Sequence, residues 1–390
     1  MPKLVVASVQ QQLRLFDSPD SYRKELTRFL NMAHAKGAEL LVFPALAGVM
    51  AASHRIEGFR MNLLKQADDR QRGKSSVFAR TRSALAGSTA SLLGASFRKG
   101  YAGLLQADAA GLAAAYEAAF SESAKAYEIT IVAGSAYLPD AAGVIRHRVT
   151  VFGPDGAVLG KHDKMMIAHE DAGWATAGES WRVVTTPVGR LGIMLGEEAL
   201  YPESGRLLAY QGADLLVTLA ATTGEALAAY VRHGAIAQAQ ENRCFAMSSF
   251  LVGKNRLAQD ENTAGGFVGR SGIYAPLEMT PRYSGVLVEM GASEAEGLIT
   301  AELDRDRLQE LWENGVEPVR RRIPVNLFAG YLPALYDSRR TLADAWLRSA
   351  ADAPSPSLLP PPVTTQDGVA PAASSTDVEA TGQHDVEAGE

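Results

Sequence analysis

Short apolar runs alternate along the chain with segments in which apolar residues recur at helical spacing. Residues 4–9 form an apolar run, residues 21–36 carry helical spacing, and a second apolar run at 38–43 ends at Pro44. This pattern predicts strand, helix and strand in succession. Later apolar runs predict further strands at 129–135, 147–152, 191–195, 214–219, 244–251, 266–273, 285–289 and 297–303. One long helix is expected to end at Asn242 and another to cover 304–314.

The segment 190–217 is the most informative stretch, because it combines a strand, a sharp turn, a helix and a second strand. Its first apolar run is 191–195, Pro202 stands at a helix-start position, and Gly212 closes the helix before the next run. Proline is favoured at the first position of a helix. The turn therefore places residues 196–198 at the carboxyl end of a strand, where open α/β sheets bind ligands.

This segment resembles the nucleophile motif of the nitrilase, or carbon-nitrogen hydrolase, superfamily. The motif reads Gly-Arg-x-Gly-apolar-x-apolar-Cys-Tyr-Asp-x-x-Phe-Pro-Glu and continues through Arg and a helix to Gly-Ala-Asp. The positions in register with it are Gly189, Arg190, Gly192, Tyr201, Pro202, Glu203, Arg206, Gly212, Ala213 and Asp214. Gly196 stands in the place of the cysteine, and Glu197 and Glu198 replace an aromatic residue and an Asp.

Further blocks spread over residues 3–325 carry the same resemblance. The second strand ends in Phe43, Pro44 and Ala45 where the family has Phe-Pro-Glu, and the segment GKHDKMMIAHEDAGW resembles the family's lysine motif. The other positions that match are Ala7, Gln10, Lys164, Glu170, Trp174, Arg232, Glu241 and Asn242. The resemblance implies a four-layer α-β-β-α sandwich, and a homodimer that extends the sandwich across helices near Arg206.

Two of the groups that carry the family's chemistry are missing. In the family a cysteine thiolate attacks a nitrile or amide carbon, a glutamate moves the proton, and a lysine stabilises the developing anion. Gly196 has no side chain with which to attack, and Ala45 has no proton acceptor. Because such groups act as a unit, we expect hydrolysis by the family's route to be absent. Ala45, Lys164 and Gly196 mark the family's catalytic positions, and no residue is assigned a catalytic role.

Lys164, Glu170 and Glu197 are the candidate ligand-binding residues. An ammonium and a carboxylate at the floor of a cleft can hold a small carboxylate, amide or zwitterion. Alternatively, each charge has a partner and only stabilises the lysine loop, because buried charges must be paired. The sequence leaves both interpretations open. Glu198 is expected to make structural hydrogen bonds at the turn.

Other residues offer weaker alternatives to the missing groups. Thr222 or Thr223 with His162 or His169 would form a hydroxyl–imidazole pair. The same histidines with nearby carboxylates resemble a metal site, but their spacing fits no motif. We interpret these side chains as solvated loop residues, and Cys244 as a buried core residue. No phosphate loop, dinucleotide-binding loop or zinc-hydrolase motif occurs, so the sequence predicts neither a cofactor nor a metal.

Residues 46–127 form a longer segment than the family needs at this place. The segment is rich in Ala, Leu, Ser and Gly, and its apolar part at 84–97 has basic residues on both sides. We interpret it as extra helices packed on the body or on a protein partner. The alternative is a segment at 80–99 that lies on an anionic membrane surface, since about 10–14 apolar residues with basic flanks are too short to span a membrane.

Composition bounds the class of protein. The 390 residues are 47% hydrophobic and 21% charged, with 38 basic and 44 acidic side chains and one cysteine. A soluble protein without disulfides is expected, and the brief apolar N-terminus predicts a cytoplasmic location without a signal peptide. Residues 351–390 hold seven acidic and no basic residues, and their composition predicts disorder. The body is therefore nearly neutral, and no nucleic-acid partner is expected.

The sequence thus predicts a nitrilase-like domain at 1–325 with an insert at 46–127, a C-terminal extension at 326–350 and a tail at 351–390. The first function hypothesis is a catalytically silent homologue that binds a small ligand or acts as a scaffold or regulatory protein. One alternative is an active hydrolase of C–N bonds with substitute residues, such as a water held by Glu170 or Glu197. The other is a membrane or protein-interaction module built on the insert.

Overall fold

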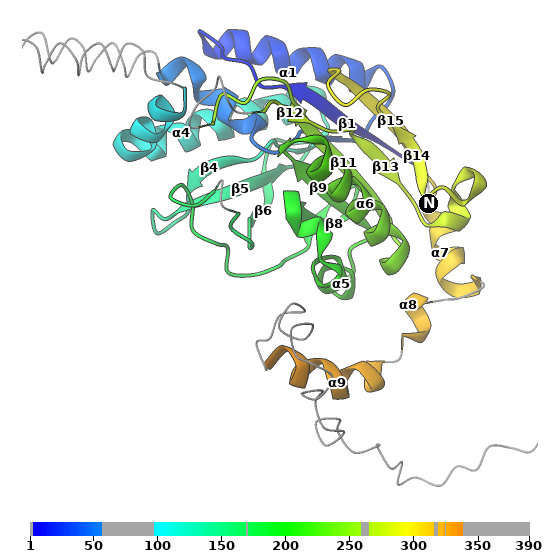
Figure 1. Cartoon of the computed structure of the whole chain (residues 1–390). Coiled ribbons are helices and arrows are strands. Elements are labelled where there is room, and N and C mark those ends of the chain that lie inside the picture. The colour runs from blue at the N-terminus through cyan, green and yellow to red at the C-terminus, as the bar shows by residue number, and fades with distance from the viewer. Residues whose placement is uncertain are drawn as a thin grey trace, which may run out of the picture. The chain divides into compact units, whose positions relative to one another are not determined.

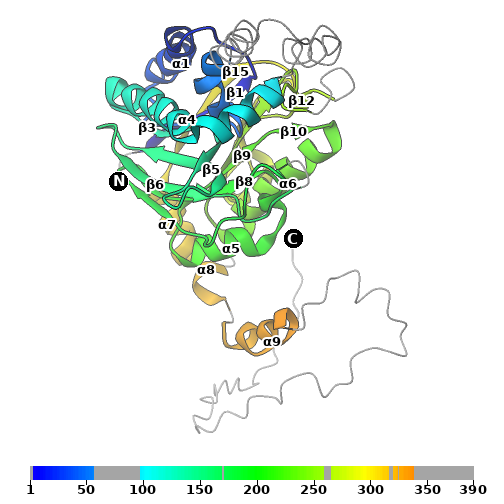
Figure 2. The same cartoon turned by 90° about the vertical axis from the view of Figure 1, so that its left-hand side faces the viewer.

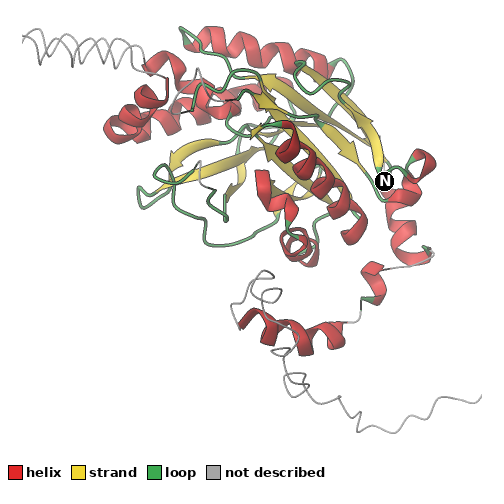
Figure 3. Ribbon diagram, in the orientation of Figure 1, coloured by secondary structure: helices red, strands yellow, loops and turns green. Residues whose placement is uncertain are grey.

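The chain divides into two compact units, Met1–Arg322 and Ile323–Glu390. The computed structural model describes residues 3–56, 97–168, 171–258, 265–315, 319–323 and 325–337. Figure 1 shows the first unit as a group of strands with helices on both sides, and Figure 3 shows the same arrangement by type of secondary structure. The candidate site lies in this first unit.

The strands of the first unit form two sheets that join along one edge. The first sheet contains β1 Leu4–Gln12, β2 Leu40–Val42, β3 Thr130–Val132, β4 Ala136–Pro139, β5 Ile145–Phe152, β6 Val158–Asp163 and β15 Gly297–Leu303. The second contains β7 Val184–Thr186, β8 Gly189–Leu195, β9 Leu215–Ala220, β11 Phe245–Val252, β13 Gly272–Tyr274 and β14 Val286–Glu289. The join is a short parallel pairing at the ends of β1 and β11, where Gln11 lies opposite Leu251 and Gln12 opposite Val252. Beyond this corner the two sheets separate and face one another.

A shared apolar core fills the space between the two sheets. It takes Val6, Leu40 and Val149 from the first sheet, and Ile193 and Val217 from the second. Each of these side chains is completely buried. Since alternate residues of a strand point to opposite faces, the other faces of the strands are left for helices to cover.

Helices cover both outer faces, which completes the four-layer α-β-β-α sandwich. Figures 1 and 2 show α1 and α4 together over the first sheet, and α5 and α6 together over the second. The bounds of the helices are α1 Pro19–His34, η1 Ala47–Ala52, α4 Phe97–Tyr127, η2 Gly196–Leu200, α5 Pro202–Tyr210, α6 Glu225–Asn242, η3 Leu277–Met279, η4 Pro281–Tyr283, α7 Arg305–Asn314 and α8 Val319–Arg322. The predicted fold class is therefore confirmed.

Local sequence signals explain where several helices begin. A capping box formed by Ser18 and Ser21 starts α1, two residues before the predicted position, because Pro19 is also compatible with the first turn. Pro202 starts α5 as predicted, and the Asp304 side chain accepts the Arg307 N–H to cap α7. These signals depend only on neighbouring residues, so the sequence is sufficient to locate them.

One strand prediction is wrong, and the strand β6 was missed. The predicted strand at 266–273 is wrong as one element, because it is divided into β12 Phe267–Val268 and β13. Between them Gly269 lies against the Phe250 ring with no room for a Cβ, and the Ser271 side chain bonds the backbone of another strand. The separate strand β6 was not predicted, because its sequence VLGKHD is half exposed and has no apolar run.

The predicted insert contributes η1 and α4 to the described structure. Within α4, Asp108 departs from helical geometry, and its carboxylate pairs with Arg55. Most of the apolar segment at 84–97 and most of the predicted interaction segment at 80–99 lie outside the described residues, which resume at Phe97. Arg98 stacks over the Trp174 ring at 4.6 Å and donates to the Leu257 carbonyl. Among the helices of the described ranges, none is long and apolar enough to cross a membrane.

The second unit contributes α9 Val325–Asp337, which contains Pro333. Its exposed large side chains are Val325, Phe328, Leu332 and Tyr336. They recur at intervals of three and four residues, which is the spacing of one helix face. The tail predicted to be disordered, 351–390, lies outside the described residues.

The core beneath α1 and α4 supplies a stability prediction. Phe120 is completely buried, and its ring centroid lies 5.1 Å from that of Tyr116 and 5.5 Å from that of Phe43. Phe120→Ala is expected to lower the free energy of unfolding by about 3–5 kcal/mol, because it leaves a cavity between elements that cannot collapse. Urea denaturation measures the change. Leu15→Ala, at a side chain that is 44% exposed, is the control and should change stability by less than about 0.5 kcal/mol.

Candidate functional site

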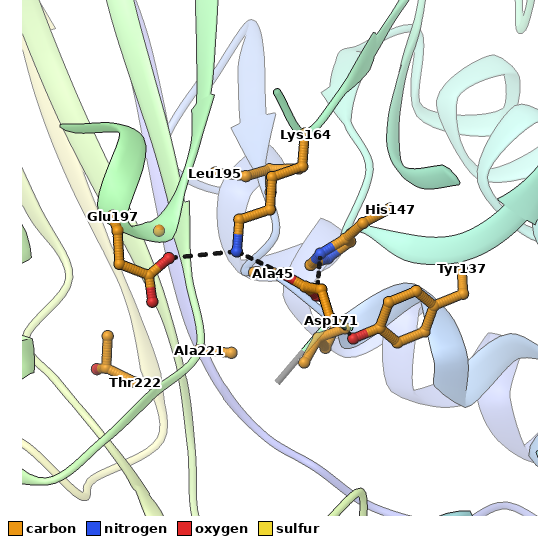
Figure 4. A pocket seen from close by; sticks show the side chains of 11 residues that line it. Ala45, Tyr137, His147, Lys164, Asp171, Leu195, Glu197, Ala221 and Thr222 are labelled. Carbon is orange, nitrogen blue, oxygen red and sulfur yellow. Dashed lines mark hydrogen bonds and ion pairs between the residues drawn. The ribbon is translucent and has the colours of Figure 1, made fainter. Parts of the chain in front are cut away.

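A pocket opens where several strands of both sheets end. Ala45 follows β2, Gly196 and Glu197 follow β8, and Thr222 follows β9. Lys164, which follows β6, completes this group (Figure 4). The structure therefore brings together Ala45, Lys164, Gly196 and Glu197, which are far apart in the sequence. Glu170, the remaining candidate residue, lies outside the described residues.

Gly196 leaves open the space that a side chain would fill. Its φ is +56°, in the left-handed region that glycine adopts without strain. A Cβ placed on its backbone would meet no atom within 4 Å. The pocket has therefore not been filled at the position where the motif has a cysteine.

Ala45 lines the same pocket with only a methyl group. The next residue, Leu46, has a φ of +60°, which is unusual for a residue with a branched side chain. Its N–H donates to the Ser135 hydroxyl at 2.8 Å, and this bond holds the backbone at the start of η1. The turn is thus fixed by Ser135 and needs no polar side chain at position 45.

Lys164 is a buried ammonium with two carboxylate partners. Its Nζ lies 2.6 Å from Asp171 Oδ2 and 3.2 Å from Glu197 Oε2 (Figure 4). Burial lowers the pKa of Lys164, but Asp171 and then Glu197 outweigh this effect, so the pKa lies above its usual value. The backbone is fixed as well, since the Lys164 N–H donates to the His147 carbonyl. Lys164 is therefore a fixed positive charge at the pocket wall.

Asp171 is a buried carboxylate that accepts hydrogen bonds from three side chains. Its Oδ1 accepts from the Tyr137 hydroxyl and from His147 Nδ1, each at 2.9 Å, and its Oδ2 accepts from Lys164. Burial raises the pKa of Asp171, but His147 and Lys164 outweigh it and hold the pKa well below its usual range. Asp171 was not among the candidate ligand-binding residues, and its contact with Lys164 was not predicted from the sequence.

His147 and Ser135 extend this network and were not identified from the sequence. His147 Nε2 lies 2.7 Å from the Ser135 hydroxyl, while its Nδ1 bonds Asp171. The order serine, histidine, aspartate resembles that of a hydrolytic triad. However, Ser135 is completely buried, does not line the pocket, and already accepts the Leu46 N–H. Ser135 therefore orients His147 and is not placed to attack a ligand.

Glu198 has the structural role that was expected at the turn. It is completely buried and accepts from the N–H groups of Leu195, Met165 and Met166 and from His162 Nε2. Burial raises the pKa of Glu198, but His162 and the backbone N–H groups of Leu195 and Met165 together outweigh it, so the pKa is lowered. Glu198 thereby ties the turn after β8 to the loop that carries Lys164.

The weaker alternatives receive little support from the geometry. His162 bonds Glu198, and the Thr222 hydroxyl donates to the Val268 carbonyl. His169 lies outside the described residues. Burial raises the pKa of the Cys244 thiol to about 12, as expected of a core residue. In the described part of the chain, no group of three or more His, Cys, Asp or Glu side chains is arranged to hold a metal ion.

The cavity is small. Its volume is about 30 Å³, whereas one water requires about 10–15 Å³ by the same measure. A ligand of a few heavy atoms therefore fits without rearrangement. The walls combine the charged groups with Leu46, Leu195 and Ala221, and such a mixture of apolar walls and few polar groups is typical of ligand sites.

Comparison with known proteins identifies the family. The carbon-nitrogen hydrolase family matches residues 5–312. The chain belongs to the carbon-nitrogen hydrolase family. Solved carbon-nitrogen hydrolases share its fold: the enzyme from Helicobacter pylori G27 has a TM-score of 0.56 at 20% identity and covers 85% of this chain and 99% of its own. For Nit3 of Saccharomyces cerevisiae the TM-score is 0.54 at 17% identity, covering 82% of this chain and 97% of its own.

Curated relatives within the family are distant. A probable hydrolase, YhcX of Bacillus subtilis, is 27% identical over 201 residues, which are 51% of this chain and 38% of YhcX. The omega-amidase NIT2 of Bos taurus is 27% identical over 217 residues, which are 53% of this chain and 69% of NIT2. The matched part of this chain thus spans well under half of the length of YhcX and about two thirds of the length of NIT2.

The Asp171 network predicts a pH dependence of stability. Because the pKa of Asp171 is lowered in the folded state, its contribution is complete above the unfolded value of about 3.9 and is lost as the pH falls through the folded value. Asp171→Asn is expected to cost about 3 kcal/mol at pH 7, since it removes one partner of a buried pair. The difference from the wild type should shrink below about pH 4.

Urea denaturation between pH 3 and pH 7 measures this difference. The control is Asp20→Asn, at an exposed side chain that pairs with Arg23 on the surface, for which the change should stay below about 0.5 kcal/mol at every pH. A loss in Asp171→Asn that is the same at pH 7 and pH 3 would contradict the assignment.

Proposed function

We propose that this member of the carbon-nitrogen hydrolase family binds a small polar ligand and does not hydrolyse C–N bonds by the thiol route of the family. It then acts as a ligand-binding, scaffold or regulatory protein. The observation that carries the proposal is the open pocket itself. Lys164 and its carboxylate partners surround this pocket, whereas Gly196 and Ala45 provide no reactive group.

The missing groups explain why hydrolysis by this route is not expected. Without a nucleophile at position 196 no covalent intermediate forms, and without a carboxylate at position 45 the proton has no acceptor there. Lys164 alone provides a positive charge for the developing anion. Removal of one member of such a unit already abolishes most of the rate enhancement. The pocket can then still bind a small ligand without hydrolysing it.

The size and polarity of the pocket suggest the class of ligand. A cavity for a few heavy atoms, with an ammonium and a carboxylate on its wall, suits a small amide or a small carboxylate. Several relatives are omega-amidases, which supports the same choice. We therefore propose ligands of this class.

An active hydrolase with substitute residues is the second candidate. The observation in its favour is Glu197, whose Oε2 contacts Lys164 while the side chain is 32% exposed toward the pocket. A carboxylate in this place could accept a proton from a water, beside an ammonium that stabilises the product of attack. This candidate predicts turnover that depends on Glu197.

Hydrolysis is expected to be undetectable in the wild-type protein and to appear when the missing groups are restored. The variant A45E/G196C/E197Y returns the carboxylate, the thiol and the aromatic residue of the family motif. The Cβ of residue 196 has open space, although the left-handed backbone costs about 1–2 kcal/mol. Ammonia release from a panel of primary amides measures both proteins. Thermal shift with the same amides should show stabilisation of the wild type without turnover.

The matched control is A45Q/G196C/E197Y, which keeps the size of the new side chains but lacks the proton acceptor and should stay inactive. Turnover by the wild type that disappears in Glu197→Gln would establish the second candidate instead. A wild type that is neither active nor stabilised by small amides or carboxylates would disprove the proposed ligand binding.

We also propose a homodimer through the outer face of η2, α5 and α6. Exposed large side chains gather on these elements: Leu200, Tyr201, Leu207, Tyr210 and Tyr230. The elements contact one another, and exposed apolar side chains on neighbouring elements can mark an interaction site. A symmetric dimer uses the same face on both copies.

Charged substitutions test the dimer. Leu207→Glu and Tyr210→Glu place unpaired charges on the proposed interface and should convert a dimer into a monomer, as measured by light scattering coupled to gel filtration. Leu15→Glu, at an exposed side chain outside this face, is the control and should leave the mass unchanged. A monomeric wild type at micromolar concentration would exclude this dimer.

A further inference from the structure

We infer that Glu197 has taken over the electrostatic role of the carboxylate that the chain lacks at position 45, and that within the proposed ligand class it makes the pocket prefer a small amide to a carboxylate of equal size. The ligand-selecting part of this inference rests on the proposed function. The relocation of the charge does not, because it concerns only side chains of this chain.

The first step is the set of contacts around Lys164. Asp171 and Glu197 approach its ammonium from different elements, the lysine loop and the turn of η2. Asp171 accepts from three donors, whereas Glu197 accepts from Lys164 alone among the described residues. Glu197 is thus held to the site by its charge pair with Lys164 and not by a wider network.

The second step is the position of Ala45 in the same wall. Ala45, Lys164 and Glu197 line one cavity (Figure 4). A carboxylate at position 45 would therefore be a third one around a single buried ammonium, together with Asp171 and Glu197. Like charges in so confined a place repel strongly, because little water screens them. The pocket accommodates a carboxylate at 45 or at 197, but not at both.

The same repulsion acts on a ligand. An anion that accepts a hydrogen bond from Lys164 lies in the same small cavity as the Glu197 carboxylate, where the two negative charges repel. An uncharged group with an acceptor next to an N–H donor avoids this conflict, because its N–H can donate to Glu197. Glu197 therefore selects against carboxylates of equal size.

A double-mutant cycle tests the relocation without any ligand. The variants are Ala45→Glu, Glu197→Gln and the two combined, and thermal and urea unfolding measure them. Ala45→Glu alone is expected to lower the unfolding midpoint, whereas in the Glu197→Gln background it should be neutral or stabilising. The effects are then non-additive, as expected for groups that interact directly. Additive effects would overturn the relocation.

Two controls separate charge from shape and from general surface effects. Ala45→Gln adds the same volume without charge, so its effect should not depend on residue 197. Glu203→Gln removes a carboxylate from an exposed position on α5 and should not change the effect of Ala45→Glu. If Ala45→Gln shows the same coupling as Ala45→Glu, the interaction is steric and the inference fails.

The ligand experiment uses propionamide and propionate, which have nearly the same shape. Calorimetry on the full-length wild type should show propionamide binding at least about tenfold more tightly than propionate, and Glu197→Gln should reduce this ratio to about twofold or invert it. An unchanged ratio in Glu197→Gln would overturn the selection by Glu197. If neither probe binds the wild type, both the proposed function and the ligand selection are rejected, while the double-mutant cycle still decides the relocation.

Discussion

The burial of the Lys164 ammonium is the constraint around which this site is organised. An unpaired buried cation would cost many kcal/mol, so Asp171 and Glu197 must remain close to it. Asp171 in turn requires donors, which Tyr137 and His147 provide. Each buried polar group in this network therefore needs a hydrogen-bond partner, and the series of bonds continues through Ser135 to the backbone N–H of Leu46.

These contacts explain how the pocket keeps its shape with Ala45 and Gly196 in its wall. His147 is oriented by Ser135, and Ser135 holds the Leu46 N–H beside Ala45. On the other wall Glu198 fixes the turn that begins at Gly196. Neither anchor uses a side chain at position 45 or 196. The hydrogen bonds that define the cavity are therefore independent of the side chains at these two positions.

The sequence predicts the parts of this structure that depend on neighbouring residues. Apolar runs locate β8 and β9, and Pro202 locates the start of α5, so the meeting of Gly196, Glu197 and Lys164 follows from strand ends and a family motif. The Asp171 network is different, because it joins two loops and two strands through side-chain hydrogen bonds that have no period along the chain.

Stability alone does not account for the charged pocket. Replacing buried ion pairs by well-packed apolar groups is often neutral or stabilising, so stability alone does not explain why Lys164, Asp171 and Glu197 surround an open cavity. The proposed ligand binding would provide a reason. The wall that carries Glu197 is continuous with η2, which packs tightly on α6 because Gly234 has no Cβ beside the Ala199 carbonyl. A ligand bound as proposed would contact an element that packs directly on α6, and it would thereby be linked to the helices that carry the proposed dimer face.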